Sequence, residues 1–213
     1  MGRKTLLLAL FCLLQFSAKS QACITTHFSG MIIQGEAMGR GYIGDDLGLG
    51  LNLVYGLPLG NRAHFNLVAS HLRYSIDYMS PGTEQSSYYY GKGSHSSVGV
   101  GLMIFPFAPG GRASLYQPFR LYIAGNGGMA VQHNKPIDVV NLPSSFTVFD
   151  QTKVHPYAEA MIGIKIRVNP KLSFDVFAAG RSTFSDDIDG LAGTGAGSDI
   201  IGRVGIGICS KLY

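Results

Sequence analysis

The sequence is short of charged residues. Only 14% of its 213 residues are Asp, Glu, Lys or Arg, and 46% are hydrophobic. A soluble domain carries about 25% charged residues on average. This composition is therefore unlike that of an ordinary soluble domain.

Long apolar segments are also missing after the N-terminal region. Beyond Cys23 a glycine, proline or charge interrupts every apolar stretch, whereas a membrane-spanning helix needs about 20 consecutive apolar residues. The mature chain is therefore not expected to cross a membrane with helices.

Cysteine is scarce, with three residues in the whole chain. No clustered His, Cys, Asp or Glu ligands and no catalytic motif stand out. We therefore expect no cofactor and no resident metal, and an enzyme is not the leading interpretation.

The first 22 residues have the layout of a secretory signal peptide. Arg3 and Lys4 precede an apolar run from Leu6 to Phe16, and Ser20 and Ala22 are suitable small residues before a cleavage site. Cleavage after Ala22 leaves a mature domain of residues 23–213. A lipoprotein with a modified Cys23 is the alternative, but Ser20 stands where a lipobox has an aliphatic residue.

Removal of this segment also removes most of the apparent positive charge. Three of the 17 basic residues lie within it, so the mature chain has 14 basic and 13 acidic side chains. No basic surface for nucleic acid is expected.

The mature chain shows apolar and polar residues in alternation, which is typical of β-strands with two different faces. In residues 157–168 the even positions are apolar, while Glu159, Lys165 and Arg167 occupy odd positions. Comparable runs cover residues 31–39, 47–57, 64–78, 98–104, 120–126, 172–182 and 200–213. The total is eight expected strands. The 29 glycines also favour strands over helices, whose interiors glycine destabilises.

Shorter connections alternate with mostly longer ones that are rich in Ser, Gly, Asp and Tyr, which is the plan of an outer-membrane barrel. A soluble barrel would have to bury the charged face of each strand at high cost. If the apolar face contacts lipid and the charged face lines the interior, the conflict disappears. We therefore predict an all-β fold, an eight-stranded antiparallel transmembrane β-barrel with an up-and-down meander.

The segments RSTFSDDIDG (181–190) and SDIIGRVGIGICSKLY (198–213) resemble the C-terminal hairpin of small bacterial outer-membrane barrels. These are the porin-family proteins related to the transmembrane domain of outer-membrane protein A and to PorT-like proteins. The aromatic last residue, Tyr213, resembles the signal that the barrel assembly machinery recognises. The resemblance implies the fold, the outer-membrane location and contact with outer-membrane lipid, but no chemistry.

Nine charged or imidazole side chains are predicted to form a polar network in the barrel interior. Because eight strands leave a lumen that side chains can fill, we favour a packed interior over an open pore. The nine residues are His71, Arg73, Asp77, Glu159, Lys165, Arg167, Asp175, Arg181 and Arg203.

The two cysteines of the mature chain lie near its two ends. The first and last strands of a closed barrel are neighbours, and the periplasm is oxidising. We therefore predict a Cys23–Cys209 disulfide, with two separate thiols as the alternative.

Three further features are open to a functional interpretation. His95 and Ser97 are spaced as in a lipid-directed hydrolase, similar to the His-x-Ser of lipid A deacylases, but no orienting carboxylate follows before Asp138. Asp186, Asp187 and Asp189 could bind calcium, although a solvated turn is the simpler interpretation. The cluster Tyr88–Tyr90 is typical of an aromatic belt at the membrane surface.

The leading functional hypothesis is a non-enzymatic barrel that is structural or binds a protein partner through its outer loops, near residues 79–93 and 133–152. A passive pore for small solutes is the second hypothesis. A lipid-modifying hydrolase is the third.

Overall fold

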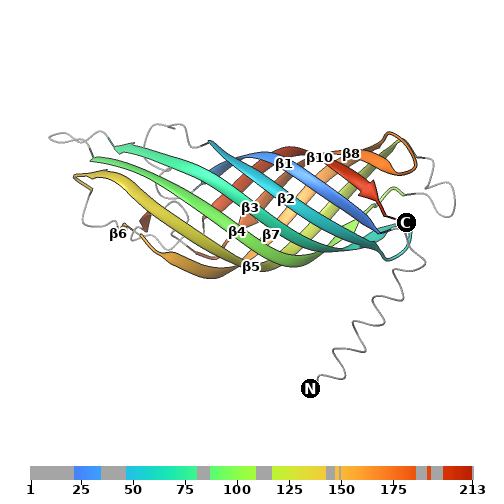
Figure 1. The fold of residues 1–213 in the computed structure, drawn as a ribbon, viewed down its shortest axis with the longest axis horizontal. Helices are drawn as coiled ribbons and strands as arrows, with labels where there is room; N and C mark the ends of the chain where they lie inside the picture. The colour runs from blue at the N-terminus through green and yellow to red at the C-terminus, as the bar shows by residue number, and fades with distance from the viewer. Residues whose placement is uncertain are drawn as a thin grey trace, which may run out of the picture.

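Eight long antiparallel strands form a closed barrel in the computed structural model, which describes residues 22–34, 47–80, 87–108, 117–142, 147–148, 150–185, 191–192 and 199–212 (Figure 1). Each long strand pairs with the next along the chain, and the first pairs with the last. The eight are β1 (Cys23–Gln34), β2 (Leu47–Pro58), β3 (Ala63–Ser80), β4 (Ser87–Ile104), β5 (Phe119–Val140), β7 (Thr152–Arg167), β8 (Leu172–Ser182) and β10 (Ile200–Lys211). The predicted eight-stranded up-and-down barrel is thus confirmed.

A separate two-stranded sheet pairs β6 (Thr147–Val148) with β9 (Leu191–Ala192). Within the described ranges, no helix has the length and hydropathy needed to span a membrane. The predicted signal peptide falls outside the described residues, except for Ala22.

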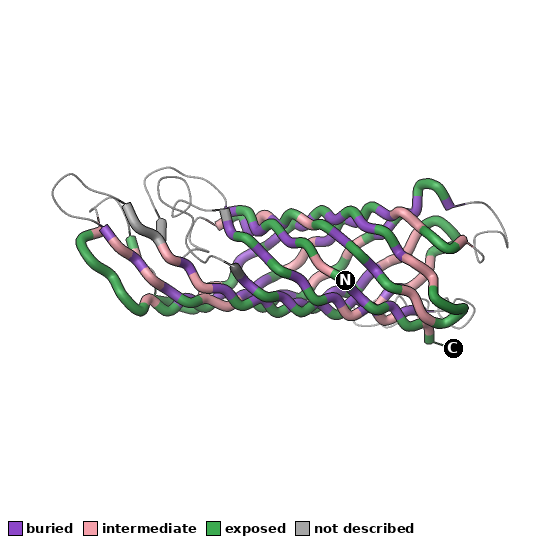
Figure 2. Tube along the Cα trace, turned by 90° about the horizontal axis from the view of Figure 1, so that it is seen from above, coloured by how far each residue is buried: buried purple, intermediate pink, exposed green. Residues whose placement is uncertain are grey.

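Burial alternates along the strands, as Figure 2 shows. On β7, Ile162 and Ile164 are exposed on the outside, while Glu159 and Lys165 are buried inside. Apolar residues such as Leu51 on β2 and Val176 on β8 continue the outer apolar surface around the barrel. An apolar exterior around a polar interior is stable only when lipid surrounds the wall, so the barrel has the surface of a transmembrane protein.

Tight connections and both chain ends mark one end of the barrel. The β2–β3 turn contains Gly60 at a φ of 115°, a conformation that glycine adopts without strain. In the β7–β8 turn the Asn169 side-chain oxygen accepts hydrogen bonds from the backbone nitrogens of Lys171 and Leu172, both at 2.8 Å. Cys23 and Lys211 are cross-strand partners at the same end. Short turns and both termini characterise the periplasmic end of outer-membrane barrels, so we call this end periplasmic and the opposite end extracellular.

Several inward glycines lie opposite large aromatic side chains. Gly163 on β7 is the direct cross-strand partner of Tyr122, and Gly93 on β4 is that of Tyr74. A Cβ atom on Gly163 would lie 2.5 Å from the Tyr122 ring, and one on Gly93 would lie 2.2 Å from the Tyr74 ring. These glycines therefore provide the space that aromatic rings occupy inside a narrow barrel, which accounts for part of the high glycine content.

The strands differ from the sequence-based expectations in extent. The first strand already begins at Cys23, before the predicted start at Met31, and residues 35–39 of the predicted strand lie outside the described residues. The expected loop regions 79–93 and 133–152 were too wide, because β3 continues to Ser80, β4 already begins at Ser87 and β5 continues to Val140. In these regions β3, β4 and β5 pair with one another well beyond the last β2–β3 pair, Leu49 with Arg73.

Two buried apolar clusters lie inside the barrel at different heights. The cluster nearer the extracellular end consists of Met31, Ile33, Leu72, Tyr74, Ile76, Tyr89 and Ile201. The cluster nearer the periplasmic end consists of Met103, Phe105, Ala108, Tyr122, Ala124, Met161 and Phe177. They lie on either side of a polar group of side chains at the centre of the barrel.

Candidate functional site

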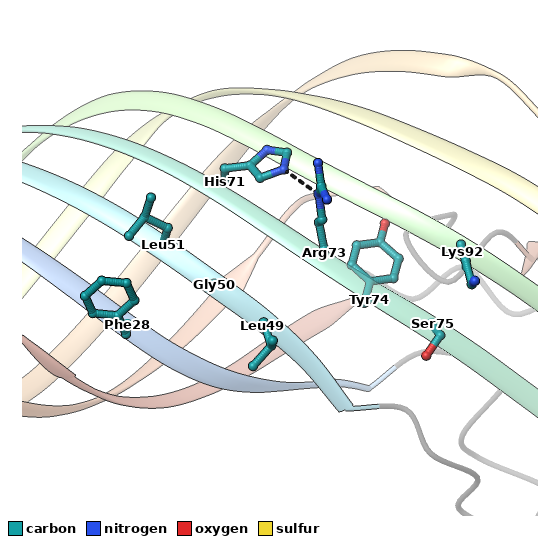
Figure 3. Close-up of a pocket in the computed structure, with 9 residues that line it drawn as sticks. All are labelled: Phe28, Leu49, Gly50, Leu51, His71, Arg73, Tyr74, Ser75 and Lys92. Atoms are coloured by element: carbon teal, nitrogen blue, oxygen red, sulfur yellow. Dashed lines mark hydrogen bonds between the residues drawn. The ribbon is translucent and has the colours of Figure 1, made fainter.

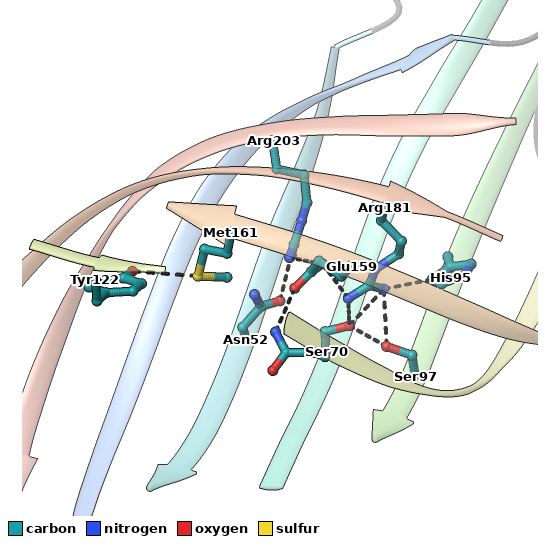
Figure 4. Close-up of polar contacts among 10 residues, drawn as sticks. Asn52, Ser70, His95, Ser97, Tyr122, Glu159, Met161, Arg181 and Arg203 are labelled. Carbon is teal, nitrogen blue, oxygen red and sulfur yellow. Dashed lines mark hydrogen bonds and ion pairs between the residues drawn. The ribbon is translucent and has the colours of Figure 1, made fainter. Parts of the chain in front are cut away.

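The most elaborate side-chain arrangement in the described residues is a buried polar network at the centre of the barrel (Figure 4). Glu159 on β7 is its hub. Its Oε2 atom lies 2.9 Å from Nη2 of Arg181 on β8 and also accepts a hydrogen bond from Arg203 on β10. Asn126 on β5 donates to the other carboxylate oxygen at 3.2 Å. One carboxylate thus neutralises part of the charge of two guanidinium groups in a water-poor space.

Arg181 extends the network to the opposite wall. Its Nη1 atom donates to Ser97 at 3.1 Å and to Ser70 at 3.2 Å, and it lies 3.3 Å from Nδ1 of His95. The guanidinium carbon also lies 4.3 Å from the centroid of the Tyr157 ring. Because Arg181 has no exposed surface and contacts residues from β3, β4 and β7, it ties the two sides of the barrel together.

Arg203 connects the network to a further strand. Its Nη1 atom donates to the side-chain oxygen of Asn52 on β2 at 2.8 Å. The network therefore includes residues of β2, β3, β4, β5, β7, β8 and β10.

A second polar group lies nearer the periplasmic end. His27 on β1 and Asp175 on β8 are 2.9 Å apart, and the Lys165 ammonium nitrogen lies 3.8 Å from the same Asp175 oxygen. Lys165 also donates to Thr25 at 3.4 Å. These groups fill the lumen with mutually compensating charges.

Of the nine residues predicted for the interior network, the structure places five inside. Glu159, Arg181 and Arg203 are in direct contact, and Lys165 and Asp175 form the second group. Arg167 is half-buried at the periplasmic turn and donates to the backbone oxygen of Asn169 at 3.3 Å.

His71, Arg73 and Asp77 do not line the interior, so this part of the prediction needs correction. On β3 the charged face is the outer one, and Leu72, Tyr74 and Ile76 point inward into the extracellular apolar cluster. The rule that charge points to the lumen applies only where lipid surrounds the wall. His71 and Arg73 lie beside the outward Leu51 and Leu49 at the extracellular margin of that apolar surface, and Asp77 lies beyond the last β2–β3 pair, while the inner face of this part of β3 packs in the interior.

Several interior polar residues were missed in the sequence. They are Thr25, His27, Asn52, Ser70, Asn126, Gln132 and His155. The signal for the first two was available, because Thr25, His27 and Ser29 alternate with Ile24, Thr26 and Phe28. Uncharged residues elsewhere gave no comparable contrast between the two faces.

His95 and Ser97 lie in the middle of β4 rather than near a strand end. Both side chains point into the interior and are buried. Arg181 approaches each of them, and this arrangement leaves His95 beside a cation instead of an orienting carboxylate. A lipid substrate outside the wall does not reach these atoms, so the geometry does not support a hydrolase.

The structure describes the tyrosine cluster predicted from the sequence but not the predicted calcium ligands. Tyr88, Tyr89 and Tyr90 belong to β4, where Tyr89 is buried in the extracellular apolar cluster. The segment 186–190, with the predicted calcium ligands, lies outside the described residues. Within the described ranges, no group of three or more His, Cys, Asp or Glu side chains is placed to hold a metal ion.

Cys23 and Cys209 are both buried and present as free thiols, so the structure does not contain the predicted disulfide. Both side chains nevertheless point into the interior from the paired strands β1 and β10. They occupy diagonal positions on β1 and β10, where Cys209 pairs with Thr25 and Cys23 pairs with Lys211. The disulfide therefore stays a prediction.

Comparison with known proteins gives a result for structure only. No protein-family model and no curated protein sequence matches the chain. Among solved structures it is similar to Neisserial surface protein A, with 10% identity and a TM-score of 0.52 over 90% of this chain and 97% of that one. Other similar structures are OprG from Pseudomonas aeruginosa (15% identity, TM-score 0.48, 92% and 97% covered) and the attachment invasion locus protein Ail of Yersinia pestis (14%, 0.45, 91% and 99%). The chain thus has the fold of the small eight-stranded β-barrels of bacterial outer membranes.

Proposed function

We propose that this chain is an integral barrel of the bacterial outer membrane with a closed interior, and that it binds a protein partner through the projecting ends of β3, β4 and β5. We call residues 74–80, 87–93 and 134–140 the extracellular extension. Figure 1 shows these three strands reaching beyond β1, β2 and β10 at the end opposite the C-terminus. The exposed apolar tip of this extension carries the proposal.

The tip of β5 presents apolar side chains outside the lipid-facing region. Ile137, Val139 and Val140 are 51%, 44% and 42% exposed. They follow the exposed basic residues His133 and Lys135, which separate them from the lipid-facing Val131 along the strand. Because apolar side chains gain nothing from facing water, an exposed apolar group at this height favours a contact with a partner.

Among the described residues, the extension also has two strand edges without a pairing partner. Pairing between β5 and β7 ends at His133 with Thr152, and pairing between β2 and β3 ends at Leu49 with Arg73. Beyond these rows, no described strand pairs with the outer edge of β3 or with the β7-facing edge of β5. Such edges can accept an extended segment of another protein by strand addition.

The interior argues against the alternative of a passive pore. Eight strands leave a lumen only wide enough for side chains, and here the central polar network and the two apolar clusters occupy it. Solute transfer would require these contacts to separate together.

Site-specific photocrosslinking in intact cells tests the partner-binding proposal. A photoreactive residue at position 137 or 140 should give one discrete protein adduct, identified by mass spectrometry. The same residue at the lipid-facing position 154 should not. The adduct should also form between the purified barrel and the purified partner, and Ile137→Ser with Val140→Ser should weaken it. Adducts with lipid alone at all three positions would contradict the proposal.

A further inference from the structure

A groove with a volume of about 440 Å³ lies on the outer wall, across β1, β2, β3 and β4 (Figure 3). The outward side chains that line it include Phe28, Leu49, Leu51, His71, Arg73 and Lys92. None of these residues is acidic.

The two parts of the groove differ in chemistry. Phe28, Leu49 and Leu51 are 57%, 76% and 47% exposed on the wall. Arg73 and Lys92, also exposed, lie on β3 and β4 farther toward the extracellular end (Figure 3). One surface therefore combines an apolar part, suited to hydrocarbon, with a cationic part.

His71 orients the arginine of this groove. Arg73 Nε donates to His71 Nε2 at 3.2 Å, and Nδ1 of the same imidazole lies 2.8 Å from the Ser96 hydroxyl. Because Nε2 accepts a hydrogen bond, the proton of a neutral imidazole is on Nδ1, where it donates to Ser96. The Arg73 side chain is thus fixed through Nε, and its two terminal nitrogens have no partner among the described residues, so they can face an anion.

Cationic residues continue on the neighbouring strand. Lys92 is the cross-strand partner of Lys135, and Ser94 beside it pairs with His133, both on β5. The acidic residues Asp77 and Asp138 lie one row farther out, on either side of Tyr90.

We propose that this groove binds a phosphorylated lipid of the outer leaflet, with a phosphate group against Arg73 and Lys92 and an acyl chain along Phe28, Leu49 and Leu51. The position follows from the register, since Leu49 and Leu51 face lipid directly beside Arg73 and His71. Arginine binds phosphate oxygens through two parallel hydrogen bonds, and lysine adds a point charge. Lipid A, with phosphates and acyl chains on one glucosamine disaccharide, combines both chemistries and is the occupant to which we commit.

Native mass spectrometry of the full barrel released from lipid nanodiscs tests this site. The probes are bisphosphorylated lipid A and the same lipid after removal of both phosphates. The wild-type barrel should retain the phosphorylated form at least tenfold better, because each charge-assisted contact contributes about tenfold or more. The double variant Arg73→Gln with Lys92→Gln should reduce this retention to the level of the dephosphorylated lipid.

The matched control removes the same charge at the periplasmic end, with Arg62→Gln and Lys171→Gln, both exposed residues. It should leave retention unchanged, and heat-modifiable gel migration shows that each variant is folded. Equal retention of the two lipids by the wild type, or an equal loss in both double variants, overturns the proposal. Competition by inorganic phosphate without retention of lipid A overturns it as well, because it would identify a site for a soluble anion.

Discussion

Glu159 and Arg181 are direct cross-strand partners on β7 and β8, and their side chains form an ion pair of 2.9 Å that has no exposed surface. Replacement by Glu159→Gln would leave Arg181 and Arg203 facing each other without a counter-charge. Because a buried charge without its partner costs about 3–5 kcal/mol, we expect the free energy of unfolding to fall by that amount. Urea titration of the barrel in lipid vesicles, followed by gel migration without heating, measures it.

The control for this substitution is Asp150→Asn, which removes an exposed carboxylate of the same chain. A change of at most about 0.5 kcal/mol is expected there. If both substitutions shift the urea midpoint equally, Glu159 is not the hub of the network.

Glycine-to-alanine substitutions should separate inward from outward positions. A Cβ atom on Gly163 would lie 2.5 Å from the buried Tyr122 ring, whereas one on Gly180 meets no atom within 4 Å. We expect Gly163→Ala to lower the free energy of unfolding by about 1–3 kcal/mol through overpacking. Gly180→Ala should be neutral or slightly stabilising, and the same titration compares the two. Equal effects would show that Tyr122 does not need the space beside Gly163.

We expect the wild-type barrel to conduct no steady ionic current in planar bilayers. The charges of the interior form ion pairs, and the apolar clusters lie on both sides of them. Heat-modifiable gel migration shows that the protein in the sample is folded. If such a sample gives steady ohmic current steps, the pore hypothesis is supported instead. The leakage of a small dye from vesicles that contain the barrel measures its permeability independently, and no leakage is expected.

Oxidation should join Cys23 to Cys209 in the exported protein, because the two buried cysteines occupy diagonal positions on the paired strands β1 and β10. After denaturation, a maleimide polymer should add to no cysteine without reductant and to two after reduction. Cys209→Ser should leave one reactive thiol in both conditions. Two labelled cysteines without reductant would rule out the disulfide, and a third label after reduction would show that Cys12, and thus the predicted signal peptide, is retained.

The sequence was sufficient to predict the side-chain directions of the barrel where lipid surrounds the strands. Glu159, Lys165 and Asp175 alternate with aliphatic residues, and this contrast identified the inward face of β7 and β8 correctly. The strand number, the meander and the tight turn at Asn169 followed from the same alternation and from turn chemistry.

The alternation of polar and apolar residues was insufficient on β3. It separates the two faces of the strand, but it does not tell which face points into the barrel and which points out. Leu72 and Tyr74 have the pattern expected of a lipid-facing row, yet they pack inside with Met31 and Tyr89. The height of a strand relative to the membrane decides which of its faces points inward, and that height depends on the register of all eight strands. The sequence likewise could not predict the ion pairs of Glu159 with Arg181 and Arg203, because three separate strands position their atoms.

The central polar network has a consequence for the order of assembly. Asn52 on β2 contacts Arg203 on β10, and Ser70 on β3 contacts Arg181 on β8, so these contacts join residues more than 100 positions apart. Contacts between such distant residues form only after the intervening chain has been organised. The ion pairs with Glu159 join β7, β8 and β10, which lie next to one another in the barrel, so they do not need the first and last strands to meet. Completion of the cylinder instead supplies the neutral oxygen acceptors, Asn52 and Ser70, that complete the hydrogen bonds of the two buried guanidinium groups.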